Sequence, residues 1–356
     1  MPGASQPRAN VVGVGLIGGS IGLALRRGGW HVSGVDHDAA RTDRALELGV
    51  LDDVGLDPDA ELTFVATPVR AVAEAARKAL AGTSGLVTDV GSVKAPIVAA
   101  VDDARFVGGH PMAGSEQEGV EGATGDLFEG AVWVLTPSAG TDDAAYARIR
   151  AVVSGFGAEV IDLPPERHDE LVAVVSHVPH LTAASLMRIA DERADEHVAL
   201  LRLAAGGFRD MTRIASGHPG IWPDICEENR SAIVAGMDRL IAALAEAREQ
   251  VASSDRDALL ADLTRARAAR VNLPARYTRP SELAEVRVPV PDRPGVLADV
   301  TMLATELDVN IVDLEIAHSS EGQQGVLILI VEGTLVERLR GGLLARGYRP
   351  SIQHLD

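Results

Sequence analysis

Two histidine-containing stretches have residue types and spacings that could do chemistry. His110 follows two glycines and precedes Pro111 in GGHPMAG, so we expect an imidazole on a stiff, uncovered loop. An imidazole with an ordinary pKa of about 6.5 can exchange a proton near neutral pH. In SHVPH, His177 and His180 stand three residues apart, which places them on one helical face. A metal pair is one alternative there, but no third ligand stands at suitable spacing, so we expect no metal.

An arginine pair and a glycine-rich turn add two binding chemistries. FRDMTRIA carries Arg209 and Arg213 four residues apart, and a guanidinium matches a carboxylate bidentately. A solvated arginine paired with a nearby acid is the alternative. The run GVGLIG, residues 13–18, fits G-x-G-x-x-G, follows a strand-like run and opens a helix-like one. It predicts a turn and a helix N-terminus that bind the phosphates of a dinucleotide.

The second strand-like run ends in Asp36, which can bind both ribose hydroxyls and repels a 2′-phosphate. NAD is therefore favoured over NADP. Two later strand ends should face the same crevice: Thr67 is expected as a helix cap with Pro68 at the first helical position, and Ser92 follows the next strand. The predicted cofactor-binding residues are Gly13, Gly15, Leu16, Ile17, Gly18, Asp36, Thr67, Pro68 and Ser92.

Short apolar runs alternate with helix-like stretches up to residue 164: NVVGVG, HVSGVD, LTFVAT, GLVTDV, RFVGG, AVWVLTP and AEVIDL. This order predicts an α/β domain at 1–164 with a parallel, doubly wound Rossmann-type sheet. Residues 165–276 lack strand signals and should form an all-helical domain whose apolar faces favour a homodimer. After a proline-containing linker, residues 282–356 have the order βαββαβ of a ferredoxin-like module.

Composition limits the possible partners. The chain has 356 residues and a net charge of −18, which argues against nucleic acid or an anionic membrane as the main partner. One cysteine, Cys226, cannot form an internal disulfide, which is typical of a reducing compartment. The apolar run at 11–25 is shorter than the roughly 20 residues of a membrane span. We therefore expect a cytoplasmic protein.

Five stretches occur in the order seen in the prephenate dehydrogenase family: GVGLIGGSIGLAL, DVGSVK, GGHPMAGSE, SHVPH, and FRDMTRIA followed by IWPDI. The chain resembles this family, which includes the arogenate and cyclohexadienyl dehydrogenases of tyrosine biosynthesis, from residue 10 to about 250. The resemblance implies NAD-dependent oxidative decarboxylation of prephenate to 4-hydroxyphenylpyruvate. The alternative within the family is arogenate as substrate, which gives tyrosine directly.

The resemblance also implies roles for residues. His110 takes the proton of the ring hydroxyl as hydride leaves for the nicotinamide, and Ser92 gives the same hydroxyl a second hydrogen bond. Arg213 holds one of two carboxylates; the side-chain carboxylate is the less costly target, because a salt bridge to the ring carboxylate would oppose its loss as CO₂. The implied substrate-binding residues are His180, Arg213, Ser115, Glu116, His177 and Trp222.

The C-terminal stretches DRPGVL and VNIVDLE resemble an ACT domain, a small-ligand regulatory module. This implies feedback by tyrosine or phenylalanine, bound at Asp292, Pro294 and Gly295 with Asn310 from a partner copy. A module kept only for oligomer assembly is the alternative.

Two rival functions fit part of the pattern. A β-hydroxyacid dehydrogenase shares a Rossmann domain followed by helices, but such enzymes use a lysine base in the second domain, and no lysine follows Lys94. A non-catalytic sensor could combine NAD and amino-acid sites. It would not need Ser92, His110, His180 and Arg213 together.

Overall fold

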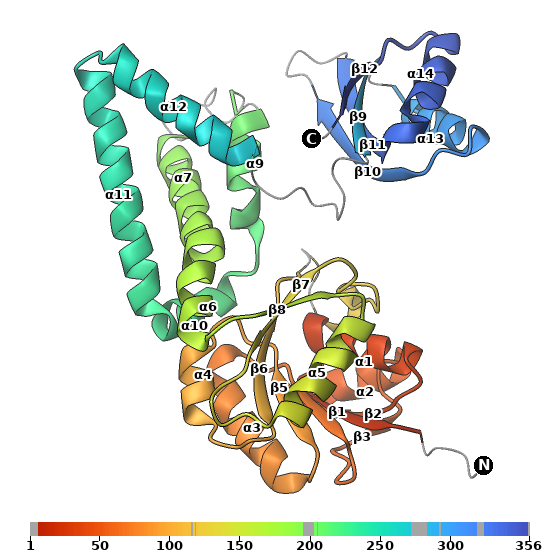
Figure 1. Cartoon of the computed structure of the whole chain (residues 1–356), viewed down its shortest axis with the longest axis vertical. Helices are drawn as coiled ribbons and strands as arrows, with labels where there is room; N and C mark the ends of the chain where they lie inside the picture. The colour runs from red at the N-terminus through yellow and green to blue at the C-terminus, as the bar shows by residue number, and fades with distance from the viewer. Residues whose placement is uncertain are drawn as a thin grey trace. The chain divides into compact units, whose positions relative to one another are not determined.

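The computed structural model describes residues 6–114, 117, 119–194, 203–204, 206–271, 283–291, 293–318 and 324–354. The chain forms two compact units (Figure 1). One comprises Met1–Leu186 with Ile214–Ala243, and the other comprises Met187–Arg213 with Leu244–Asp356.

An eight-stranded sheet forms the centre of the first unit, in the order β3-β2-β1-β4-β5-β6-β7-β8. The central position of β1, with the order reversing beside it, confirms the predicted Rossmann-type sheet. The strands are β1 (Arg8–Val12), β2 (His31–Val35), β3 (Asp53–Val54), β4 (Leu62–Val65), β5 (Leu86–Asp89), β6 (Phe106–Pro111), β7 (Val132–Thr136) and β8 (Glu159–Asp162).

One pairing differs from the expected all-parallel sheet. Strands β6 and β7 pair antiparallel, whereas the other neighbours in this sheet pair in parallel. A parallel pair needs a crossover connection, usually an α-helix. The described residues between β6 and β7 hold a 3₁₀ turn, η1 (Val120–Gly122), and no α-helix. The chain therefore reverses direction at this point.

Helices cover both faces of the sheet. Apolar residues of α1 (Leu16–Arg27) and α5 (Asp143–Gly155) share a buried cluster with Phe64, whereas those of α3 (Val69–Gly82) and α4 (Ala95–Ala100) share another with its neighbour Val65. Successive residues of a strand point to opposite faces, so these are the two faces of the sheet. Helix α2 (Ala39–Glu47) follows β2.

Helices without strands follow the sheet, as the sequence predicts. Helix α11 is 23 residues long. The elements are α6 (Pro165–Val172), the π-helical turn η2 (Ala173–His177), α7 (Val178–Ala194), α9 (Gly206–Thr212), the 3₁₀ turns η3 (Arg213–Ser216) and η4 (Pro219–Ile221), α10 (Trp222–Glu228), α11 (Arg230–Ala252) and α12 (Arg256–Val271).

One helical stretch, Pro165–Glu192, is long and apolar enough to cross a membrane by length and composition. Its residues His168 and Asp169 are nevertheless buried, and Asp169 accepts hydrogen bonds from main-chain groups that follow β5.

The C-terminal sheet has the order β10-β11-β9-β12. Its elements follow the predicted βαββαβ order: β9 (Leu283–Pro291), α13 (Val296–Glu306), β10 (Ile311–His318), β11 (Gln324–Glu332), the 3₁₀ turn η6 (Gly333–Leu335), α14 (Val336–Ala345) and β12 (Ser351–His354). The three strand pairs are antiparallel. Buried residues of both helices and of β9 and β11 form a separate apolar core.

Candidate active site

The glycine-rich turn between β1 and α1 is built for close backbone contacts. Gly13 has a φ of 92°, and a Cβ added there would lie 2.5 Å from the Ala66 carbonyl oxygen. A Cβ at Gly18 would lie 1.9 Å from the Gly13 oxygen, so this residue allows helix and turn to pack. Gly15 differs, because no atom lies within 4 Å of an added Cβ. The space above Gly15 is therefore open to a ligand.

The first turn of α1 has no acidic residue, and no side chain caps its N-terminus at Gly15. Its main-chain N–H groups therefore favour an anion. Asp36 lies beside this turn: its Oδ2 accepts the Val14 N–H at 2.9 Å, and its Oδ1 accepts the Asp38 N–H at 3.0 Å. The His37 Nδ1 is also 2.7 Å from Oδ1. These contacts fix the Asp36 carboxylate next to the turn.

Thr67 and Pro68 do not act at the helix start as predicted. Pro68 is itself the N-cap, with extended backbone, and α3 begins at Val69 without a side-chain cap. Proline sets its own φ but has no side-chain acceptor, so it can precede a helix without capping it. The Thr67 Oγ1 is buried and has no hydrogen-bond partner among the described residues. This unsatisfied hydroxyl, following β4, suits a polar group of a bound ligand.

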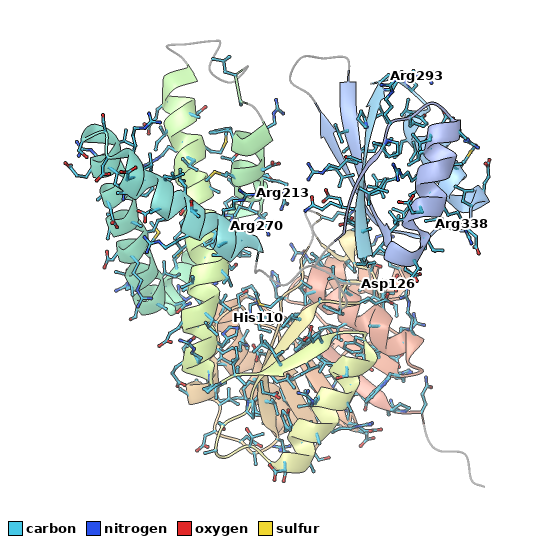
Figure 2. All side chains as sticks on the ribbon, turned by 45° about the horizontal axis from the view of Figure 1, so that its top comes forward. His110, Asp126, Arg213, Arg270, Arg293 and Arg338 are labelled. Atoms are coloured by element: carbon cyan, nitrogen blue, oxygen red, sulfur yellow. The ribbon has the colours of Figure 1, made fainter. Side chains whose placement is uncertain are left out.

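His110 is part of strand β6 rather than of an open loop (Figure 2). It pairs with Val134 of β7 and is 8% exposed. The prediction of a bare loop was wrong because β7 covers the glycines from the side. His110 still borders a pocket of about 330 Å³ at the carboxyl end of β6. The pocket is lined by Ser92, His110, Pro111, Met112, Ala113, Ser176, His177, Ile221, Trp222 and Ile225.

A buried chain of polar groups lies behind His110. Its Nδ1 is 2.8 Å from the His168 Nε2, and the His168 Nδ1 is 2.7 Å from the Asp169 Oδ1. Burial lowers the pKa of His110 well below its ordinary value, and the neighbouring His168, Lys94 and His177 lower it further. His110 is therefore neutral at physiological pH and able to accept a proton.

Lys94, which lies between β5 and α4, is fully buried. Its ammonium group pairs with Asp89 and donates a hydrogen bond to the Gly109 carbonyl at 2.8 Å. Asp89 in turn accepts the Gly109 N–H at 3.1 Å and the Gly91 N–H at 2.8 Å. Burial lowers the pKa of Lys94, and the Asp89 carboxylate opposes that shift. The pair holds the backbone immediately before His110.

Trp222 brings the two histidines of SHVPH together. Its ring stacks on His180 with centroids 3.6 Å apart and meets His177 edge-on at 6.0 Å. His177 closes the π-helical turn η2 and is 1% exposed. Burial lowers the pKa of His177 to about 4, and burial also lowers the pKa of His180. Both rings are therefore neutral at pH 7.

Family models match two parts of the chain. The prephenate dehydrogenase nucleotide-binding domain matches residues 21–162, and the prephenate dehydrogenase dimerization domain matches residues 164–265. A prephenate dehydrogenase of Bacillus subtilis (strain 168) is 35% identical over 334 residues, covering 89% of this chain and 90% of the relative. This chain belongs to the prephenate dehydrogenase family.

Two solved structures of the family resemble this chain. The prephenate dehydrogenase of Aquifex aeolicus, crystallised with hydroxyphenyl propionate and NAD⁺, aligns with a TM-score of 0.71 at 31% identity. The alignment covers 76% of this chain and 99% of that one. The arogenate dehydrogenase of Synechocystis aligns with a TM-score of 0.65 at 29% identity, covering 74% and 98%. The Bacillus relative covers a larger share of this chain, so that similarity extends into the C-terminal module.

The other predicted substrate-binding and effector residues of this prephenate dehydrogenase family member belong to the helical region, to the C-terminal module or to positions outside the described residues. Arg213 is the first residue of η3 and the last residue of the Met187–Arg213 segment. Ser115 and Glu116 lie outside the described residues, as does Asp292 of the expected effector loop. In the C-terminal module, Gly295 is the left-handed N-cap of α13 with a φ of 91° and Pro294 precedes it, while exposed Asn310 directly precedes β10.

The sequence pattern did not single out His168, Asp169 or Asn229. The adjacent His-Asp pair in PERHDEL was the available signal, but an acid next to a histidine on a helix is common. Asn229 is buried between α10 and α11 and donates through Nδ2 to the Asp169 carbonyl at 2.9 Å. The structure places all three behind the pocket.

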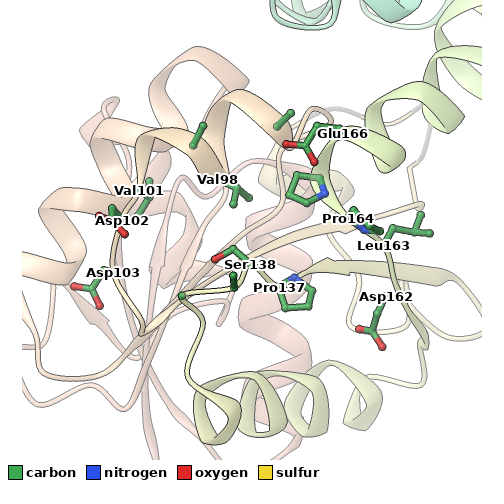
Figure 3. A pocket seen from close by; sticks show the side chains of 15 residues that line it. Val98, Val101, Asp102, Asp103, Pro137, Ser138, Asp162, Leu163, Pro164 and Glu166 are labelled. Carbon is green, nitrogen blue, oxygen red and sulfur yellow. The ribbon is translucent and has the colours of Figure 1, made fainter.

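A larger pocket of about 750 Å³ lies at the opposite edge of the sheet (Figure 3). It is bordered by Asp102 and Asp103, which precede β6, and by Pro137 and Ser138, which follow β7. Because β7 runs antiparallel to β6, these residues lie at the end where β6 begins. This pocket is therefore separate from the His110 pocket.

Proposed function

We propose that this protein catalyses the NAD-dependent oxidative decarboxylation of prephenate to 4-hydroxyphenylpyruvate. The observation that carries the proposal is the neutral His110 beside Ser92 in a pocket at the carboxyl end of the sheet. Ligands of doubly wound α/β folds bind at that edge. The Aquifex relative, crystallised with NAD⁺ and a hydroxyphenyl acid, supports the same combination of cofactor and substrate class.

The residues of the turn fit NAD. The open backbone at Gly15 and the uncapped start of α1 suit a pyrophosphate. Asp36 suits the ribose hydroxyls, and the unpartnered Thr67 hydroxyl supplies a further polar contact. When bound, NAD supplies the hydride acceptor for the carbon that carries the substrate hydroxyl. Leu16, Ile17 and Pro68 complete the proposed cofactor contacts.

His110 accepts the hydroxyl proton, and Ser92 donates a hydrogen bond to the same oxygen. Loss of the ring carboxylate as CO₂ then makes the ring aromatic, which drives the reaction. His177, His180 and Trp222 shape the substrate side of the pocket. We extend the proposal to a carboxylate clamp at Arg213 and to substrate contacts at Ser115 and Glu116.

Arogenate is the second candidate substrate, favoured by the similarity to the Synechocystis enzyme. The two substrates differ only in a keto or amino group on the side chain, remote from the hydroxyl that His110 would deprotonate. The base and the cofactor turn therefore serve either reaction.

The test mixes the full-length protein with NAD and either prephenate or arogenate and follows NADH absorbance. We expect NADH formation, with His110→Asn lowering kcat about 10²–10⁴-fold while NAD binding is kept. His31→Asn, an exchange in β2 away from the pocket, is the matched control. Unchanged turnover in His110→Asn would show that His110 is not the base.

The pH profile has a defined sign. Because the pKa of His110 is lowered, its imidazole stays unprotonated through neutral pH and can accept a proton. We expect kcat/KM to be flat near pH 7 and to fall only on the acidic side of about 6.5.

Three wider properties belong to the same proposal. The protein is a cytoplasmic homodimer that associates through the helices matched by the family's dimerization domain. The C-terminal module is an ACT domain that binds tyrosine or phenylalanine, with Asp292, Pro294, Gly295 and Asn310 at the effector site. Its ferredoxin-like sheet order supports this role. Adding tyrosine to the NADH assay tests whether the effector inhibits.

A further inference from the structure

The side chain of Asp169 is held by the start of α4. Its Oδ1 accepts the Lys94 N–H at 2.7 Å, and its Oδ2 accepts the Ala95 N–H at 2.9 Å. An ionised carboxylate only accepts hydrogen bonds. The short contact between Oδ1 and the His168 Nδ1 therefore requires a hydrogen on that nitrogen.

The position of this hydrogen fixes which ring nitrogens carry hydrogen in the contact between His168 and His110. A His168 ring whose single hydrogen is on Nδ1 has its lone pair on Nε2, 2.8 Å from the His110 Nδ1. His110 must then donate from Nδ1, which leaves its lone pair on Nε2. In this arrangement His110 accepts protons through Nε2.

The main-chain carbonyl of Asp169 acts on a second histidine through Asn229. This carbonyl can only accept, so the Asn229 amide must turn its Nδ2 towards it, at 2.9 Å. The same Nδ2 lies 3.2 Å from the His177 Nδ1. His177 therefore accepts at Nδ1 and carries its hydrogen on Nε2. Burial keeps this ring neutral, since it lowers its pKa to about 4.

We propose that Asp169 is a positioning residue that fixes the two pocket histidines in opposite tautomers, through His168 and Asn229. His110 presents an acceptor and His177 presents a donor to the same pocket. A hydroxyl group both donates and accepts, so the pair matches an alcohol that is being deprotonated. This match to an alcohol rests on the proposed function, whereas the two tautomers do not.

The arrangement also stabilises the proton once transferred. When Nε2 of His110 takes the hydroxyl proton, the ring becomes an imidazolium that still donates from Nδ1 to His168. The Asp169 carboxylate lies behind His168, with its Oδ1 2.7 Å from the His168 Nδ1. This offsets part of the burial that makes a charged His110 unfavourable.

The test measures tautomers in the resting protein. The full chain, labelled with ¹⁵N in its ten histidines, gives long-range ¹H–¹⁵N spectra in which protonated and bare ring nitrogens differ. His110→Asn and His177→Gln assign the two rings. We expect bare Nε2 with protonated Nδ1 at His110, and the reverse at His177. The opposite tautomer at either ring in the wild-type protein overturns the proposal.

Two variants separate the two arms. His168→Leu should release the His110 tautomer and leave that of His177 unchanged, and Asn229→Leu should do the reverse. Glu170→Gln, next to Asp169 but in an exposed ion pair with Arg167, is the matched control and should change neither ring. If either His168→Leu or Asn229→Leu shifts both rings, or neither ring, separate control through Asp169 is contradicted.

Kinetics distinguish positioning from simple structural support. We expect His168→Leu to lower kcat about 10–10²-fold with little change in KM, and His168→Gln to recover part of the loss because its amide oxygen can accept from His110 Nδ1. Equal losses in both variants argue against the proposal. If prephenate and arogenate are not oxidised but the tautomers are as expected, the proposed function fails and the positioning role stands.

Discussion

At the scale of single residues, the chain's two lysines show that burial determines how much an ion pair contributes to the free energy of unfolding. Lys94 is fully buried against Asp89, whereas Lys78 is 74% exposed in an i,i+4 pair with Glu74. Exposed pairs contribute about 0–1 kcal/mol, but removing one partner of a buried pair leaves an uncompensated charge. The Lys94 pair also holds Gly109, so its loss should reach His110.

We therefore expect Lys94→Met to lower the free energy of unfolding by about 3–5 kcal/mol, measured by urea denaturation. Lys78→Met is the control and should change it by less than about 0.5 kcal/mol. Adding Asp89→Asn to Lys94→Met should restore part of the loss, because the unpaired charge is gone. Equal stability of Lys94→Met and wild type would show that the pair is dispensable.

At the scale of elements, the turn between β1 and α1 separates packing from ligand binding. An added Cβ at Gly15 meets no atom within 4 Å, and its φ of −75° suits any residue. An added Cβ at Gly18 lies 1.9 Å from the Gly13 oxygen. An alanine at Gly15 therefore tests ligand binding, and an alanine at Gly18 tests the stability of the fold.

We expect Gly15→Ala to melt within a few degrees of wild type but to bind NAD at least about tenfold more weakly, a loss of about 1.4 kcal/mol. Its methyl group would occupy the space for the pyrophosphate. Gly18→Ala should instead lower the melting temperature. Calorimetric titration with NAD and thermal melts provide both readouts. Undiminished NAD affinity in Gly15→Ala would place the cofactor away from this turn.

Local sequence pattern predicted the elements better than their contacts. The seven strand-like runs of the first domain form β1, β2, β4, β5, β6, β7 and β8, because alternation of apolar runs and helices is a local property. The two-residue strand β3 is too short to leave such a pattern. The reversal of β7 and the covering of His110 depend on a strand pair whose partners are 24 residues apart at His110 and Val134.

For the site as well, the sequence predicted individual residues better than the contacts between them. Types and spacing singled out His110, His177 and His180, and the family resemblance added Trp222. The structure places His110, His177 and Trp222 around one pocket, with His180 stacked on Trp222. His168 and Asp169 could not be found in this way, since the contact between His168 and His110 spans 58 residues and depends on where α6 docks. Burial of Lys94 is likewise a consequence of tertiary packing.

At the scale of the whole molecule, helix α11 presents a stripe that needs a partner. Val234, Ile241, Leu244 and Val251 are each more than half exposed, at spacings of seven, three and seven residues. This is the a/d pattern of helices that pack on one another. The helix lies in the region matched by the family's dimerization domain. We infer that the stripe packs against a second copy of the chain.

We expect Ile241→Glu to convert the dimer to a monomer at micromolar concentration, measured by sedimentation equilibrium, because a glutamate in an apolar interface loses its hydration without a partner. Ala242→Glu adds the same charge to an exposed position on the same helix, outside the stripe, and should leave the dimer intact. Dissociation by both variants would point to a general effect of charge, and dissociation by neither would place the interface on another surface. Turnover measured alongside the mass then shows whether the monomer is active.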